Sequence, residues 1–170
     1  CWEKWLLDMA GLSTLADMVP LKNENRTLAH FGLAVLRKSR RKGLQVLLQK
    51  IALMQKHLTE DDIGFMLVPR INAASRMDHP LRAFELLATT DHAEAEKLAD
   101  HLNHINDQRK GHVASMIKDA RKRLEGRELD DVIVVGDPEW NPGVLGLAAN
   151  KLMEEYKRPT FVWGYDSNGT

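Results

Sequence analysis

One long helical pattern, from residue 91 to residue 125, constrains the fold more than any other feature of this sequence. Asp91, with Glu94 three residues later, predicts the N-terminal cap, and Gly126 predicts the C-terminal end. A helix of about 35 residues spans roughly 50 Å, which is longer than a small domain is wide. We therefore expect a helix that connects two lobes, and one arm of a helical hairpin is the alternative. Its apolar residues recur mostly three or four positions apart, at Ala95, Leu98, Leu102, Ile105, Val113, Met116, Ile117, Ala120 and Leu124.

The sequence changes character after this helix. The apolar run 131–136 is typical of a buried parallel strand, and residues 160–163 predict a second strand. Between them, Asn141 and Pro142 are expected to start a helix over 143–156. These elements predict a βαβ unit with a parallel sheet. The expected fold class is α/β, with a mostly helical N-terminal part, the long connecting helix and this βαβ unit.

Before the long helix, the pattern predicts a succession of short helices. Because Pro69 is expected to break one that starts at Thr59, residues 69–79 are predicted to form an irregular segment. The first helix is expected to end at Gly11. The other helices are expected at 23–39, 44–56 and 81–88.

The composition excludes several classes of protein. Lys plus Arg equals Asp plus Glu at 24 each, so any binding to nucleic acid has to come from local clusters. The single cysteine, Cys1, excludes an internal disulfide framework and indicates a reducing, cytoplasmic location. No apolar run approaches the ~20 residues of a membrane helix. The chain begins with Cys-Trp and ends shortly after the second predicted strand, so we expect a fragment of a larger protein.

Asp17 is the first candidate for a functional residue. It is the only charged residue between Gly11 and Val19, in a run of apolar and small side chains. An isolated carboxylate in such surroundings is unfavourable unless it is paired, hydrogen-bonded or bound to a cation. A bond to backbone amides and coordination of a metal ion are both consistent with this pattern.

Two basic clusters are candidates for phosphate binding. The run 37–42 is either a solvated helix end or a patch that follows a phosphate backbone. Arg70 and Arg76 lie among alanines, and their planar donor groups suit phosphates as well as helix-end carbonyls and carboxylates.

The start of the 143–156 helix is a further candidate. Gly143 and Gly146 would permit a phosphate to approach free amides, or would allow tight packing of the helix on the sheet. The seven histidines are scattered, and His101 and His104 are expected to be surface residues rather than ligands.

Three longer segments carry a resemblance to a known family. GLSTLADMVPLKNENRTLAHFGL is similar to a segment of the form ALGTVADVVPL followed by GENR. IGFMLVPRINAASRMDHPLRAFELLATTD looks like a GPRLNAAGRL segment, and WNPGVLGLAANKLMEEYKRPTFVW looks like a WHxGVVGIVASRL unit. In this order they resemble the DHH phosphoesterase superfamily, in its branch of single-stranded-DNA-specific 5′–3′ exonucleases, and they cover most of the chain.

The resemblance implies a division into domains and a metal site. Residues 1–90 would end the DHH catalytic domain, 91–125 would form the connecting helix, and 126–170 would begin the DHH-associated domain. Asp17 would be the last aspartate ligand of a site for two divalent ions, Mn²⁺ or Mg²⁺. The catalytic residues are unknown, because the Asp-x-Asp and Asp-His-His motifs are expected upstream of Cys1.

The resemblance also implies contacts to single-stranded DNA. Arg70, Asn72 and Arg76 would lie near the DNA path, and candidate contacts to its backbone are Arg109, Lys110 and Gly143. The implied partners are a single-strand-binding protein and a helicase in DNA repair and recombination, with no membrane. With one metal ligand of the set, the isolated chain is expected to hydrolyse nothing.

Two departures and two alternatives accompany this hypothesis. Ser75 replaces a usual Gly and Asn141 replaces a common His, so the family's roles at these positions do not transfer. One alternative is a DHH phosphodiesterase acting on oligoribonucleotides or cyclic dinucleotides, but such enzymes carry a Gly-Gly-Gly-His signature that residues 143–146 lack. The other is a non-catalytic interaction protein that kept the fold and lost its active site.

Overall fold

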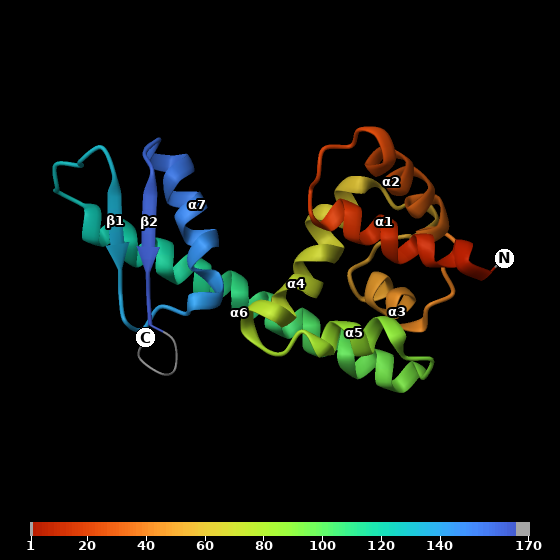
Figure 1. Cartoon of the computed structure of the whole chain (residues 1–170). Helices are drawn as coiled ribbons and strands as arrows, with labels where there is room; N and C mark the ends of the chain where they lie inside the picture. Colours follow the sequence, from red (N-terminus) through yellow and green to blue (C-terminus); the bar gives the residue numbers. More distant parts are fainter. Residues whose placement is uncertain (1, 166–170) are drawn as a thin grey trace. The chain divides into compact units, whose positions relative to one another are not determined.

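The computed structural model describes residues 2–165, so Cys1 and residues 166–170 lie outside the described part. The chain divides into two compact units, with the boundary between Asn106 and Asp107 (Figure 1). Each unit is described by itself. Among the described helices, none is long and apolar enough to cross a membrane.

The first unit is built from helices. A 3-10 helix, Trp2–Leu6, leads into α1 (Leu7–Ala16), which is followed by α2 (Asn23–Leu36) and α3 (Lys42–Lys50). A 3-10 turn (Gln55–His57) and a π-helix (Asp62–Leu67) precede α4 (Val68–Met77) and α5 (Leu81–Ala88). The core of this unit contains fully buried leucines from four helices, namely Leu36, Leu44, Leu47, Leu86 and Leu102.

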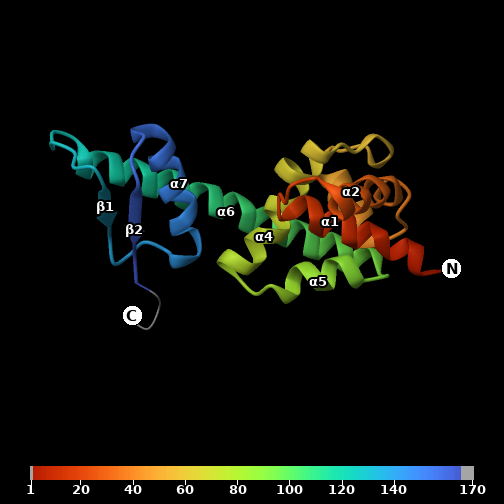
Figure 2. The same cartoon turned by 45° about the horizontal axis from the view of Figure 1, so that its top comes forward.

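The prediction that the first helix ends at Gly11 is wrong, because α1 continues to Ala16. Gly11 lies inside α1 and faces Gly32 of α2, and the two helices lie side by side in both views (Figure 2). A Cβ atom on Gly11 would lie 2.5 Å from the Cα of Gly32, which is closer than real Cβ contacts. Gly11 therefore serves close helix packing rather than helix termination.

The prediction of an irregular segment at 69–79 is also wrong. The π-helix Asp62–Leu67 runs directly into α4, and Pro69 lies in the first turn of α4. Proline is tolerated there, because the first N–H groups of an α-helix have no α-helical partner. The residues predicted to contact DNA on this segment are therefore held on a helix.

The long helix predicted from the sequence is confirmed as α6 (His92–Leu124). The backbone N–H of Glu94 donates to the Asp91 carboxylate at 2.7 Å, so Asp91 caps the helix as predicted. The carboxylate of Glu94 does not complete the reciprocal bond of a capping box, since it accepts from the Thr89 hydroxyl instead. The boundary between the two units falls within α6, and Leu102 belongs to the core of the first unit.

The second unit is the predicted βαβ unit. It contains β1 (Ile133–Gly136), a 3-10 turn (Pro142–Val144), α7 (Leu145–Tyr156) and β2 (Thr160–Trp163). The two strands are parallel, with Ile133 paired to Thr160 and Gly136 to Trp163. The mostly helical N-terminal part, the long helix and the parallel βαβ unit together confirm the expected fold class.

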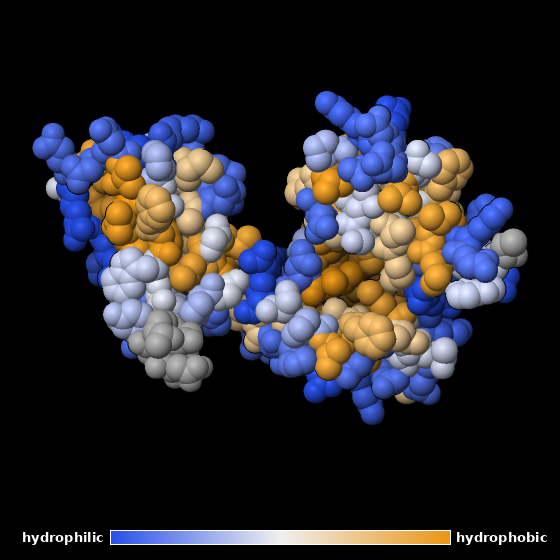
Figure 3. Space-filling view, in the orientation of Figure 1, coloured by the Kyte–Doolittle hydropathy of each residue, from blue (hydrophilic) through white to orange (hydrophobic). Residues whose placement is uncertain are grey.

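Only one face of this sheet is covered by the described residues. Ile133 and Val135 are buried, whereas Val134 and Phe161 are each 64% exposed. Figure 3 shows apolar residues gathered over β1 and β2. The apolar run 131–136 led us to expect a strand buried on both faces, as parallel strands usually are. In the part of the chain that is described, that expectation is met on one face.

Candidate functional site

Asp17 follows α1 directly and caps its C-terminal end. Its backbone N–H donates to the Ser13 carbonyl at 3.0 Å, and Met18 then turns the chain with a φ of 51°. The side chain of Asp17 is exposed, although the surrounding apolar run suggested a buried carboxylate. The negative end of a helix repels a carboxylate and attracts cations. The position of Asp17 therefore favours a bound cation.

Asp17 is a suitable single ligand but not a complete metal site. A carboxylate oxygen is the kind of donor that Mn²⁺ and Mg²⁺ prefer, so the residue fits such an ion. Within residues 2–165, no group of three or more His, Cys, Asp or Glu side chains lies close enough to hold a metal ion. If Asp17 binds a divalent ion, the remaining ligands have to come from outside these residues.

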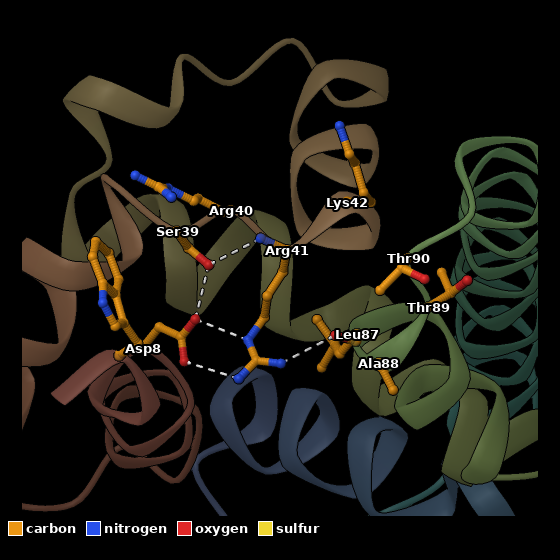
Figure 4. A pocket seen from close by; sticks show the side chains of 10 residues that line it. Asp8, Ser39, Arg40, Arg41, Lys42, Leu87, Ala88, Thr89 and Thr90 are labelled. Carbon is orange, nitrogen blue, oxygen red and sulfur yellow. Dashed lines mark hydrogen bonds and ion pairs between the residues drawn. The ribbon is translucent and has the colours of Figure 1, made fainter. Parts of the chain in front are cut away.

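The buried carboxylate of this region is that of Asp8, which sequence reasoning missed. Asp8 is 2% exposed, and its Oδ2 accepts from the Ser39 hydroxyl and from Arg41 Nε, each at 2.8 Å (Figure 4). The backbone N–H of Met9 donates to the other carboxylate oxygen at 2.7 Å. The argument applied to Asp17, that an isolated carboxylate among apolar residues needs a partner, would have found Asp8 as well.

The basic run 37–42 contains both buried structural contacts and surface charges. Arg37 donates twice to the Leu58 carbonyl, from Nε at 2.9 Å and from a terminal nitrogen at 2.6 Å. Arg41 is held by Asp8. The remaining cations of the run, Lys38, Arg40 and Lys42, are exposed. Neither sequence interpretation, a solvated helix end or a phosphate patch, covers the whole run.

The three candidate DNA contacts on α4 lie on two different faces of the helix. At about 100° per residue, Asn72 and Arg76 fall on one face, and both are exposed. Arg70 is half-buried on another face, where its Nε donates to the side chain of Asn103 on α6 at 2.6 Å. The structure therefore brings Asn72 and Arg76 together and gives Arg70 a structural contact. Their contacts to DNA stay predictions.

The turn after α4 is joined to α6 by Asp78 and His101. His101 Nε2 lies 2.8 Å from a carboxylate oxygen of Asp78, so His101 has a partner that the sequence did not reveal. The hydrogen bond from His101 lowers the pKa of Asp78 below its ordinary value of 3.8. This pair ties α6 to the end of α4, close to Arg76.

In the second unit, the turn before α7 has the predicted N-cap. The Asn141 side chain accepts from the backbone N–H of Gly143 at 2.8 Å, so this amide already donates within the chain. Nothing lies within 4 Å of a Cβ placed on Gly146, so tight packing does not explain that glycine.

Lys110 pairs with Asp107 at 3.2 Å, and Arg109 is half-buried. The roles of Arg109, Lys110 and Gly143 at the DNA backbone stay predictions.

Arg123, near the C-terminal end of α6, organises a pocket of about 340 Å³ beside the turn before α7. It donates to Asp119 at 3.0 Å, to the Gly136 carbonyl at 3.0 Å and to Asp137. Its guanidinium also lies 5.6 Å from the centre of the Trp140 ring. The backbone amide of Glu139 and then Arg123 lower the pKa of Asp137 below its ordinary value of 3.8.

The two units thus contain the long helix and the parallel βαβ unit that the sequence led us to expect. No protein-family model matches the chain. The chain is 40% identical over 162 residues to the single-stranded-DNA-specific exonuclease RecJ of Bacillus subtilis, covering 95% of this chain and 21% of that protein. It is 36% identical over 156 residues to RecJ of Thermus thermophilus, covering 91% of this chain and 22% of that protein.

Solved structures give the same result. A crystal structure of RecJ with Mn²⁺ from Thermus thermophilus matches with a TM-score of 0.84 and 34% identity, over 95% of this chain and 24% of that one. A structure of exonuclease RecJ bound to manganese matches with a TM-score of 0.82 and 34% identity, over 95% of this chain and 40% of that one. The chain is therefore similar in sequence and in fold to a segment of RecJ, and the predicted resemblance to this family is confirmed. It spans less than half the length of these relatives.

Proposed function

We propose that the chain is part of a metal-dependent exonuclease that hydrolyses single-stranded DNA from 5′ to 3′. The observation that carries this proposal is the similarity to RecJ over about 95% of the chain, in sequence and in fold together. The exposed carboxylate of Asp17 at the negative end of α1 supports it, since that position suits a ligand for a divalent ion. The metal ions of the related crystal structures are the reason to propose Mn²⁺ or Mg²⁺ as cofactors.

In this proposal Asp17 contributes one ligand to a two-metal site. When bound, the two ions supply a nucleophilic hydroxide and charge stabilisation for in-line displacement at phosphorus. Asn72 and Arg76, on the exposed face of α4, hold phosphates of the bound strand by hydrogen bonds and charge. Arg109, Lys110 and Gly143 contribute further backbone contacts from the second unit.

The proposal also covers the context of the longer protein. Residues 1–90 end its DHH domain, 91–125 form the connecting helix and 126–170 begin its DHH-associated domain. The protein acts in the cytoplasm in DNA repair and recombination, with a single-strand-binding protein and a helicase as partners. Because Asp17 is the one ligand of this site proposed among residues 2–165, the 170-residue chain alone is expected to be inactive.

End-labelled oligonucleotides test this proposal. The full-length protein with Mn²⁺ is expected to release nucleotides from the 5′ end of a single strand, to leave a blunt duplex intact, and to stop when EDTA is added. The isolated chain is expected to release none. Degradation of the duplex at the same rate, hydrolysis that persists in EDTA, or activity of the isolated chain would contradict it.

A further inference from the structure

The first unit has a pocket of about 400 Å³ that is not lined by Asp17, Asn72 or Arg76 (Figure 4). It is bordered by the 3-10 helix that carries Trp5, by the loop before α3, and by the C-terminal end of α5. Its apolar lining includes Trp5, Leu87 and Ala88, and its cations are Arg40, Arg41 and Lys42. It lies at the N-terminal end of α1, whereas Asp17 lies at the other end, about 15 Å along a helix of this length.

The wall of the pocket is fixed by the ion pair between Asp8 and Arg41. Asp8 is the only acidic residue among the lining residues, and its charge is balanced by Arg41 at 2.8 Å. Arg41 also donates to the Leu87 carbonyl at 3.4 Å, which joins the loop to the end of α5. This network stabilises the wall of the pocket. The net positive charge of the pocket therefore comes from Arg40 and Lys42.

Arg40 and Lys42 provide an uncompensated charge of two. The backbone of Arg41 is extended. The side chains of Arg40 and Lys42 therefore lie on the side of the chain opposite to the Arg41 side chain. Figure 4 shows Arg40 and Lys42 extending away from Arg41 in this way. Both are exposed, and among residues 2–165 neither has an acidic partner. Such a site attracts anions.

Trp5 adds an exposed aromatic surface to these charges. Trp5 is 47% exposed, and the Arg40 guanidinium lies 5.8 Å from the centre of its ring. Exposed aromatic rings beside cations are the elements by which proteins hold single strands, since bases stack on the ring and phosphates contact the charges. The pocket is large enough for a single base and its phosphate, because small-molecule sites have volumes from about 300 Å³ upward.

We propose that Trp5, Arg40 and Lys42 form an accessory site for a nucleotide of single-stranded DNA. A base stacks on Trp5, and the adjoining phosphates contact Arg40 and Lys42. The proposal rests on the proposed function, because it takes single-stranded DNA as the ligand. An acidic peptide with an apolar side chain shares part of this chemistry, but the exposed tryptophan beside the Arg40 guanidinium favours a nucleotide.

The test measures binding of a thymidine oligonucleotide to the full-length protein in EDTA, which prevents hydrolysis, over a range of salt concentrations. Arg40→Ala and Lys42→Ala are each expected to reduce the slope of log affinity against log salt by about 0.7, and Arg40→Lys to retain it. Trp5→Leu is expected to weaken binding about 5- to 150-fold, the range found when a stacking ring is removed. Lys38→Ala is the matched control, because Lys38 is an exposed cation of the same run that does not line the pocket, and its slope should not change.

Each other result would overturn the inference. If Lys38→Ala reduces the slope as much as the pocket variants do, the effect is general surface charge. If the pocket variants bind the oligonucleotide normally but lose binding to an Asp/Glu-rich peptide, the pocket is a peptide site. If the wild-type protein does not bind the oligonucleotide in EDTA but releases nucleotides from it with Mn²⁺, the accessory site fails and the proposed function stands. If it does neither, the proposed function itself fails. Circular dichroism of each variant establishes that it is folded before binding is compared.

Discussion

Gly11 of α1 and Gly32 of α2 meet at the crossing of their helices, where a Cβ on Gly11 would lie 2.5 Å from the Cα of Gly32. The contact involves backbone atoms on both sides, so a methyl group can be admitted only if the helices separate. We expect Gly11→Ala to lower the free energy of unfolding by about 1–3 kcal/mol, the usual effect of overpacking. Urea unfolding followed by circular dichroism measures this change.

The matched control is Gly111→Ala. Gly111 lies inside α6, and no atom lies within 4 Å of a Cβ placed there. Alanine is more favourable than glycine in a helix by about 1 kcal/mol, so this variant should be more stable than the wild type. The two changes in the free energy of unfolding need not be equal in size. If both substitutions stabilise the protein, the packing role of Gly11 is contradicted.

The ion pair of Asp8 and Arg41 leads to a second prediction. Removing Arg41 leaves a carboxylate that is 2% exposed without its charged partner, and such a change costs about 3–5 kcal/mol. Arg41→Met should therefore be strongly destabilised in urea. The double variant Asp8→Leu, Arg41→Met should be more stable than Arg41→Met alone, because no buried charge remains. A single variant as stable as the wild type would show that the pair is not required.

Asp78 and His101 predict a dependence of stability on acid. The pKa of Asp78 is lower in the folded state than its ordinary value of 3.8, with the hydrogen bond from His101 as the main cause. The contribution of Asp78 is therefore fully present above pH 3.8 and is lost as the pH falls through the lower folded pKa. Relative to the wild type, Asp78→Asn should be less stable above this pH and should lose less stability on acidification.

The control for the acid experiment is His101→Gln, which removes the imidazole that is hydrogen-bonded to Asp78. In that background, Asp78→Asn should change the acid dependence much less. Thermal unfolding at a series of pH values measures both effects. An unchanged difference in the His101→Gln background would assign the shift to another neighbour of Asp78.

Arg70 and Arg76 should differ in what their alanine variants change. Arg70→Ala loses the bond to Asn103 and is expected to lower the melting temperature, as Asn103→Ala should too. Arg76→Ala is expected to reduce the salt slope of single-strand binding by about 0.7. A normal salt slope for Arg76→Ala would remove this residue from the proposed DNA path.

The elements that could be predicted from the sequence are those whose signals are local. The spacing of apolar residues predicted α6, and Asp91 followed three residues later by Glu94 predicted its N-terminal cap. The parallel βαβ unit followed from two apolar runs around one helix. In each case the pattern and the structure depend on the same few neighbouring residues.

The errors occurred where a residue's role depends on a distant partner. Gly11 resembled a helix end because nothing nearby in the sequence indicates its contact with Gly32. The basic run 37–42 was interpreted as a surface cluster. The partner of Arg37 is Leu58 and that of Arg41 is Asp8, and both lie far along the chain. The error at Pro69 has a local cause instead, because the π-helix directly before it has no simple sequence signal.

The most direct test of the proposed function is the exonuclease rate of the full-length protein with Asp17→Asn at saturating Mn²⁺. The amide keeps the shape of the side chain and loses the charge that binds a hard cation. The rate should fall by several orders of magnitude with an unchanged melting temperature, while Asp100→Asn, at an exposed carboxylate paired with Lys50, should keep near-normal activity. Near-normal hydrolysis by Asp17→Asn would contradict the assignment of Asp17 as a metal ligand and, with it, the account of the site.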